Sequence, residues 1–121
     1  MLDVILVPST SAPGLFKLNL IFEFADINMY AYMKKRVKAR MPFTVGEVRS
    51  FIYQLLRAVS YIHKRGYFHR DVKPENIMVK NEEQIKLGDF GLIRENASAF
   101  PYTDYVSTRW YRAPECIMRS D

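Results

Sequence analysis

The amino-acid sequence predicts an α+β fold for this chain of 121 residues. Two observations favour strands: residues 4–24 are rich in β-forming side chains around a turn, and residues 77–87 contain two short apolar runs. A third observation favours helix, because residues 44–66 carry capping residues and apolar side chains at helical spacing. A chain of this length can bury one modest hydrophobic core.

The first element is predicted to be an antiparallel β-hairpin. Residues 4–7 form a short apolar run, and residues 9–14 are dense in the Ser, Pro and Gly residues that are typical of turns. Residues 15–24 follow with apolar side chains at alternate positions, as in a strand. Residues 25–28 then read as a connector.

Two helices are predicted next. Residues 29–36 indicate a short helix, and the longer helix begins with a capping box of Thr44 and Glu47 and ends at Gly66. Apolar residues recur between these caps at spacings of three and four, which predicts a core helix. The stripe comprises Val45, Val48, Ile52, Leu55, Val59 and Ile62, and it is widened by Phe51 and Leu56.

A second hairpin is predicted after the long helix. Residues 77–79 and 85–87 read as its strands, separated by the polar residues 80–84. We expect the helix to pack beneath this hairpin, with residues 68–76 as the loop between them. Residues 92–112 show no clear period, which indicates a loop.

Composition narrows the class of protein. The chain is 49% hydrophobic and 26% charged, as is typical of globular proteins. Its single cysteine, Cys116, cannot form an internal disulfide, which favours a reducing compartment. The apolar stretches are too short to span a bilayer, and the first residues lack the positive region of a secretory signal. We therefore expect a soluble protein of the cytoplasm or nucleus, without a membrane partner.

Positive charge is concentrated in one short segment. The net charge is +5, and five of the seven residues from 34 to 40 are basic. Such a run can mark nuclear import or a nucleic-acid patch, and a solvated helix end is the alternative. No aromatic residues interleave the run, as they do in proteins that bind single strands. We favour the solvated helix end and expect no nucleic-acid partner.

Three motifs carry the chemistry of the chain. Residues 68–76 read Phe-His-Arg-Asp-Val-Lys-Pro-Glu-Asn, residues 89–91 read Asp-Phe-Gly, and residues 113–115 read Ala-Pro-Glu. Each is weak by itself, but in this order and spacing they resemble the signature set of eukaryotic protein kinases. The resemblance covers almost all of the chain and implies a protein-kinase-like fold. Within the second motif, Gly91 is expected to give the backbone freedom to switch.

The resemblance implies transfer of the γ-phosphate of ATP to serine or threonine hydroxyls of protein substrates. Such transfer depends on positioning and charge neutralisation. Asp71 is then the catalytic base, and Lys73 reaches the transferred phosphoryl oxygens. Asn76 and Asp89 supply ligands to Mg²⁺, which prefers oxygen donors, and Asp89 also belongs to the ATP site. His69 is expected to pack against the Asp-Phe-Gly turn rather than act as the base.

Residues 101–115 look like the group that contains the MAP kinases and cyclin-dependent kinases. The likeness is greatest to the male-germ-cell-associated kinase family, including the MAPK/MAK/MRK-overlapping kinase. Thr103 and Tyr105 are similar to the dual phosphorylation motif of that family, which implies an upstream activating kinase; an unmodified loop is the alternative. Guanidinium groups pair bidentately with phosphate, so the expected phosphate receivers are arginines. These are Arg70, Arg109 and Arg112.

The family pattern also places a nucleotide pocket. Phe22 falls at the gatekeeper position behind the adenine, and Glu23 and Ala25 fall where hinge backbone groups bond the adenine edge. Met78 falls where a side chain floors the pocket, and Asn28 falls where a polar residue meets the ribose. Plain core packing is the alternative for Phe22 and Met78.

The resemblance implies a partial kinase domain. Residues 1–24 correspond to the end of the amino-terminal lobe sheet, residues 25–28 to the hinge, and residues 29–121 to the first half of the mainly helical carboxy-terminal lobe with its catalytic and activation loops. The glycine-rich loop and the phosphate-binding lysine of that fold have no counterpart in the sequence. We therefore expect a central kinase fragment that is inactive by itself. A non-catalytic kinase remnant acting as a binding module is the alternative: the intact catalytic set favours a kinase as the parent protein, and the missing lobe favours the remnant for this chain by itself.

Overall fold

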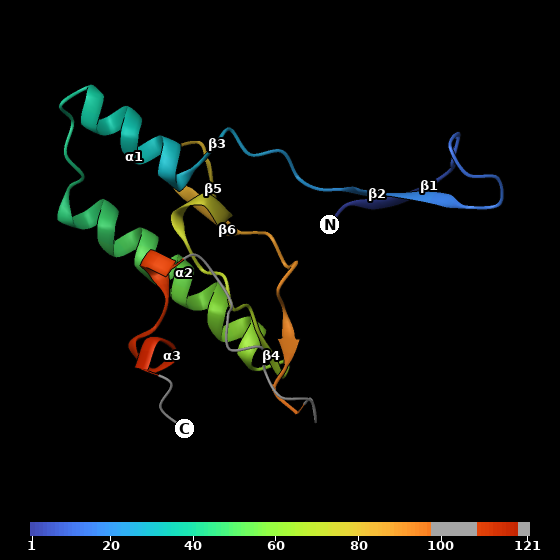
Figure 1. Ribbon diagram of the computed structural model, residues 1–121. Coiled ribbons are helices and arrows are strands. Elements are labelled where there is room, and N and C mark those ends of the chain that lie inside the picture. The colour runs from blue at the N-terminus through green and yellow to red at the C-terminus, as the bar shows by residue number, and fades with distance from the viewer. Residues whose placement is uncertain (98–108, 119–121) are drawn as a thin grey trace.

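The computed structural model describes residues 1–97 and 109–118, and its strands and helices form an α+β fold (Figure 1). Both predicted hairpins and both predicted helices are present. The elements in chain order are β1 (Asp3–Pro8), β2 (Phe16–Ile21), β3 (Ile27–Asn28), α1 (Met29–Lys38), α2 (Val45–His63), β4 (Tyr67–Phe68), η1 (Pro74–Asn76), β5 (Ile77–Lys80), β6 (Gln84–Leu87), β7 (Arg94–Glu95), η2 (Arg109–Tyr111) and α3 (Pro114–Met118).

The β1–β2 hairpin projects away from the helices (Figure 1). Its strands pair antiparallel from Asp3 opposite Ile21 to Pro8 opposite Phe16, as predicted. Gly14 supplies the left-handed conformation that the turn needs, with φ of 82°. The apolar residues of both strands are exposed, so the hairpin contributes nothing to the core described below.

The core lies between a three-stranded sheet and the two long helices. The strands are ordered β3–β5–β6, and all neighbours are antiparallel. Alternation along β5 buries Ile77 and Val79 against the helices, where they meet Tyr32 of α1 and Phe51 of α2. The short strand β3 was not predicted, because two residues are too few to show a period.

Helix α2 has the predicted caps, but the buried face is narrower than the predicted stripe. The reciprocal hydrogen bonds of Thr44 and Glu47 form the capping box, and Gly66 beyond the helix adopts φ of 79°. Phe51 and Ile62 are buried. The stripe prediction is wrong for four apolar residues, which remain exposed because the β5–β6 hairpin covers only one side of α2. These residues are Val45, Val48, Ile52 and Leu56.

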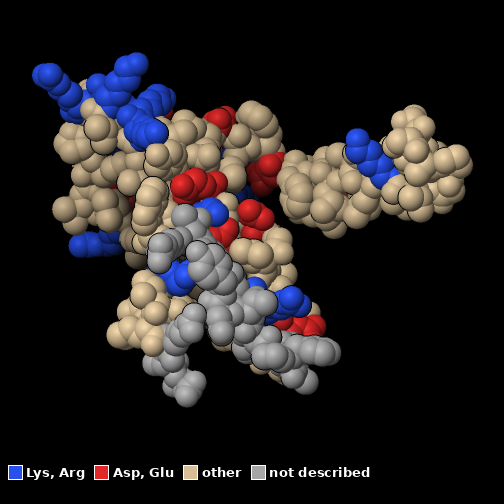
Figure 2. All heavy atoms as spheres, viewed as in Figure 1, with Lys and Arg blue, Asp and Glu red and all other residues tan. Residues whose placement is uncertain are grey.

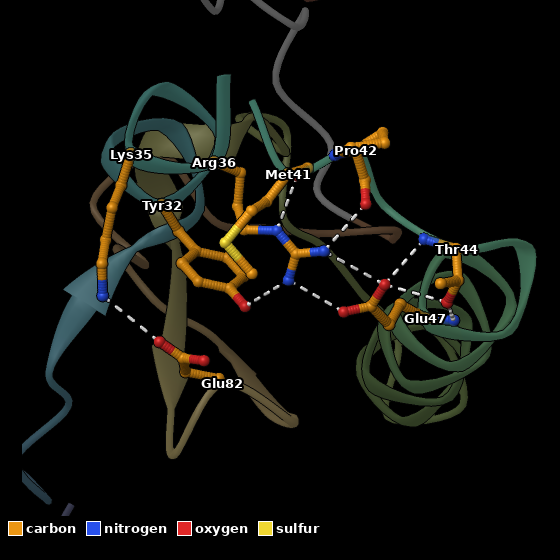
Figure 3. A network of polar contacts seen from close by, with 8 residues as sticks. All are labelled: Tyr32, Lys35, Arg36, Met41, Pro42, Thr44, Glu47 and Glu82. Carbon is orange, nitrogen blue, oxygen red and sulfur yellow. Dashed lines mark hydrogen bonds and ion pairs between the residues drawn. The ribbon is translucent and has the colours of Figure 1, made fainter. Parts of the chain in front are cut away.

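One arginine fixes the junction between the two helices (Figure 3). The guanidinium of Arg36 donates to both carboxylate oxygens of Glu47, to Tyr32 Oη, and to the backbone carbonyls of Met41 and Pro42. The hydrogen bonds from Arg36, followed by those from Thr44, lower the pKa of Glu47 to about 2. The α1–α2 turn is therefore closed by the same carboxylate that caps α2.

The basic segment forms the end of α1, where lysine and arginine side chains gather at the upper left of Figure 2. Cations in the last turn suit the negative end of the helix dipole. Arg36 is turned inward toward Glu47, and Lys35 pairs with Glu82 at 3.2 Å. None of the helices in the described ranges is long and apolar enough to cross a membrane.

Candidate active site

The loop that carries the first motif is held at both ends by strands. β4 precedes it and pairs with β7, and Gly66 O accepts a hydrogen bond from Asn96 N beside that pair. β5 follows it after the single turn η1. The loop therefore lies between α2 and the β5–β6 hairpin, as the sequence predicted.

His69 connects this loop to the Asp-Phe-Gly segment. Its side chain is 2% exposed, its Nε2 lies 2.9 Å from Gly88 O, and its Nδ1 accepts from Asp71 N at 3.3 Å. An accepting Nδ1 places the proton on Nε2, which then donates to Gly88 O. The ring also packs against Phe90 at a centroid distance of 5.3 Å. The predicted structural role of His69 is confirmed.

The carboxylate of Asp71 is the centre of a buried polar cluster. Asp71 is 5% exposed, and its Oδ2 accepts from Lys73 Nζ at 2.7 Å and from Asn76 Nδ2 at 2.9 Å. Asn76 Nδ2 also donates to Asp71 O at 2.9 Å. The structure thus brings together the three residues that were predicted to be catalytic, all from one loop.

Electrostatics keep Lys73 charged. Its hydrogen bond to Asp71 raises the pKa of the ammonium, and the nearby charges of Glu75 and Asp89 act in the same direction. Lys73 is therefore a fixed positive charge beside the Asp71 carboxylate, close enough to Asp89 to respond to its charge.

The left-handed residue of the Asp-Phe-Gly segment is not its glycine, and the predicted switching at Gly91 stays a prediction. The left-handed residue is Asp89, with φ of 57°, whereas Gly91 has no left-handed conformation. The space at Gly91 is tight: a Cβ there would lie 3.2 Å from Asp89 Oδ1, and Gly91 N donates to the same oxygen at 3.2 Å. The glycine lets the backbone amide approach and hold the aspartate carboxylate.

Asn76 and Asp89 are the residues that could hold a cation. Because Asn76 Nδ2 donates to Asp71, its Oδ1 points away from that carboxylate. The backbone carbonyl of Asn76 accepts from Gly88 N at 2.8 Å, which connects Asn76 to the residue before Asp89. Over the described part of the chain, no three His, Cys, Asp or Glu residues form a metal cluster. One amide oxygen and one carboxylate still fit Mg²⁺, which takes few protein ligands beside phosphate and water.

The residues predicted to line a nucleotide pocket lie in two places. Phe22, Glu23 and Ala25 occupy the segment between β2 and β3, and Phe22 is 56% exposed, so it is not a core residue of this structure. Asn28 and Met78 pair across β3 and β5, which puts their side chains on one face of the sheet.

Asn28 has a structural contact that the sequence did not suggest. Its Oδ1 accepts from Ala31 N at 2.8 Å and caps α1. The sequence signal that could have predicted this cap is an asparagine directly before a helix. The cap occupies the amide oxygen of Asn28, and the predicted contact with the ribose stays a prediction.

The predicted phosphorylation sites, Thr103 and Tyr105, lie outside the described residues. Of the predicted phosphate receivers, Arg109 lies in η2 and Arg112 is half-buried after it. Arg70 has φ of 67°, and its buried Nε has no hydrogen-bond partner in the described ranges.

Gly88 was missed by the sequence reasoning. Its carbonyl binds His69 and its amide binds Asn76 O, so it joins the two motifs through backbone groups alone. A Cβ at Gly88 would meet Asn76 O at an ordinary 3.7 Å. Backbone contacts of this kind leave no signature in residue type.

Comparison with known proteins places the chain. Residues 15–121 match the family described as protein kinase domain. The chain is 54% identical to cyclin-dependent kinase F-4 of Oryza sativa subsp. japonica over 103 residues. These residues cover 85% of this chain and 22% of that protein. It is 52% identical over 103 residues to serine/threonine-protein kinase MAK of Homo sapiens, and these residues cover 85% of this chain and 16% of that protein.

A third relative lies in the family that the motifs resemble. The MAPK/MAK/MRK overlapping kinase of Homo sapiens is 48% identical over 101 residues, which cover 84% of this chain and 23% of that protein. The chain thus spans roughly a fifth of the length of these relatives. Because the family match includes most of the chain, from residue 15 to residue 121, the three motifs and the loop geometry have one explanation: the chain belongs to the protein kinase domain family.

Proposed function

We propose that this chain carries the catalytic loop of an ATP-dependent protein serine/threonine kinase. The observation that supports it most is the buried carboxylate of Asp71, held by Lys73 and Asn76. Relatives that are 50% and 52% identical to the chain are named serine/threonine-protein kinases. Protein serine and threonine hydroxyls are therefore the proposed acceptors.

Asp71 is the proposed base. The two donors on Oδ2 fix the carboxylate before a substrate hydroxyl arrives, so little reorientation is needed during the reaction. The carboxylate orients the hydroxyl and takes its proton as the oxygen attacks phosphorus. Lys73 lies beside Asp71 and stabilises negative charge on the phosphoryl oxygens.

Asn76 Oδ1 and the Asp89 carboxylate are the proposed ligands of Mg²⁺. Bound with ATP, the cation neutralises charge on the transferred phosphate. The proposed adenine contacts are the backbones of Glu23 and Ala25, with Met78 as the floor. The shared sheet face of Met78 and Asn28 supports a pocket over β5.

The decisive experiment replaces Asp71 by Asn in the full-length protein that contains these residues. We expect kcat to fall about 10²- to 10⁴-fold, the usual contribution of a positioned acid–base group. Affinity for ATP should change much less, because Asp71 contacts Lys73 and Asn76 and lies on the loop rather than on the segment between β2 and β3.

Asp3→Asn is the matched control, because Asp3 is an exposed aspartate in β1 whose side chain binds only the adjacent Val4 amide among the contacts described. Phosphoryl transfer is measured with radiolabelled ATP and a generic basic protein substrate. Equal turnover of Asp71→Asn and Asp3→Asn would refute the proposed role.

A further inference from the structure

The segment between β2 and β3 is fastened to the β5–β6 hairpin by a glutamate with two lysine partners. Oε1 of Glu23 pairs with Lys80 Nζ, and Oε2 pairs with Lys86 Nζ at 3.1 Å. Each carboxylate oxygen therefore has its own cation. The two lysines come from different strands, Lys80 from β5 and Lys86 from β6.

Sheet geometry explains why the two lysines meet one carboxylate. Met78 is paired with Lys86, and Lys80 lies two residues further along β5, so all three side chains share one face of the sheet. The lysines are diagonal neighbours, close enough for their charges to repel. The carboxylate of Glu23 neutralises that repulsion, and the hydrogen bonds from Lys80, then Lys86, lower its pKa to about 2.

A second contact lies three residues further along the same segment. Asp26 N donates to Val79 O at 3.2 Å, and Asp26 Oδ2 accepts from Asn81 N at 2.9 Å. Asn81 adopts φ of 52° at the hairpin tip, where its amide points toward that carboxylate. Both ends of residues 23–26 are therefore anchored on one hairpin.

We propose that Glu23, Lys80 and Lys86 form an ionic latch that holds residues 23–26 in the position that receives the adenine of ATP. The proposal rests on the proposed kinase function, which gives the backbones of Glu23 and Ala25 to the nucleotide. Glu23 is then a positioning residue: its side chain contacts the hairpin, and its backbone faces the ligand.

The expected effect is modest because all three side chains are between one third and about half exposed. Ion pairs at such exposure contribute little, so Glu23→Gln should raise KM for ATP about two- to five-fold. The values of kcat and of KM for the protein substrate should not change, because the Asp71 cluster is untouched. High salt should shrink the difference, since it screens exposed charges.

The matched control is Glu82→Gln. Glu82 is a glutamate at the tip of the same hairpin, but it pairs with Lys35 of α1 and not with residues 23–26. The triple charge reversal Glu23→Lys, Lys80→Glu and Lys86→Glu should restore the wild-type KM for ATP. A KM in Glu23→Gln equal to that in Glu82→Gln would overturn the latch.

Hydrogen exchange separates the latch from the proposed function. The Asp26 amide, which is bonded to Val79 O, should exchange faster in full-length Glu23→Gln than in wild type or Glu82→Gln. If the wild-type protein transfers no phosphate, the proposed function fails, and hydrogen exchange at the Asp26 amide still tests the latch by itself. Unchanged exchange at Asp26 in that case refutes the latch, and faster exchange supports it.

Discussion

Two residues of the candidate site adopt the left-handed backbone conformation, which is uncommon for residues other than glycine. Arg70 has φ of 67° and Asp89 has φ of 57°. Such positions cost about 1–3 kcal/mol each and persist where the surroundings over-determine them. At Asp89 the surroundings are the Gly91 amide on its Oδ1 and the Gly88 contacts to His69 and Asn76. The strain places the Asp89 carboxylate beside the Asp71 loop.

Gly91→Ala tests this account at the scale of one residue. The added Cβ would lie 3.2 Å from Asp89 Oδ1, so the carboxylate must move and its bond to Gly91 N must weaken. We expect KM for Mg²⁺-ATP to rise several-fold, with the largest effect at low magnesium. Titration of activity against Mg²⁺ measures it.

Gly46→Ala is the control for Gly91→Ala, because a Cβ at Gly46 meets Thr44 Oγ1 at an ordinary 3.8 Å within α2. Helix propensity should make that variant slightly more stable, by up to about 1 kcal/mol. An unchanged magnesium requirement in Gly91→Ala would contradict the assigned role of Asp89.

At the scale of elements, polar side chains add to the apolar core in defining how the helices and the hairpin meet. Gln54 of α2 donates to Glu83 O at 2.9 Å and accepts from Ile85 N at 3.0 Å, which fixes the helix against the hairpin. Arg36 closes the α1–α2 turn through Glu47. Because Glu47 also caps α2, one carboxylate serves both the helix start and the turn.

The stability of this junction should depend on pH. The pKa of Glu47 falls from the ordinary 4.5 to about 2 because of Arg36 and Thr44. Because the pKa is lower in the folded state, the ionised carboxylate stabilises the fold fully above the unfolded-state pKa. This stabilisation is lost as pH falls toward about 2. We therefore expect wild type to lose stability between these pH values more steeply than Glu47→Gln.

Acid unfolding followed by circular dichroism checks the pH prediction, with Glu83→Gln as a control at an exposed position of the hairpin. Identical acid limbs for wild type and Glu47→Gln would show that the Arg36 pair does not stabilise the fold. Glu23 also has a pKa of about 2, so the comparison must be made variant by variant.

At the scale of the whole molecule, His69 links the Asp71 loop to the Asp-Phe-Gly segment, and Arg70 lies between His69 and Asp71 in the chain. The buried Nε of Arg70 has no partner in the described ranges, and a buried donor of this kind suits an incoming anion. Phosphate on Thr103 or Tyr105 would add negative charge and strong acceptors. We propose that phosphorylation of both residues activates the full-length protein.

The test of this proposal is the double variant Thr103→Ala, Tyr105→Phe. We expect wild type to gain activity after treatment with an activating kinase, or by autophosphorylation, and the double variant to gain none. Mass spectrometry checks that both sites are modified in wild type. Full activity of the double variant would show that phosphorylation is not the switch.

The sequence predicted those features whose causes are local. The capping box of Thr44 and Glu47, the glycine at 66 and the period of α2 depend on neighbouring residues, and all are present. The three motifs identified the family because their order and spacing are unique enough together. His69 could be assigned to the Asp-Phe-Gly turn on the same basis.

Only the tertiary structure decided which surfaces and backbones meet. The period of α2 gave an apolar stripe, but the hairpin covers the side of Phe51 and leaves Val48 exposed, because burial depends on which neighbours arrive. The left-handed Asp89 and the two lysines on Glu23 likewise depend on contacts between residues far apart in the chain. Residue type restricts such contacts without choosing among them, so local pattern determined the elements and the Asp71 loop motif, and long-range packing determined what lies against them.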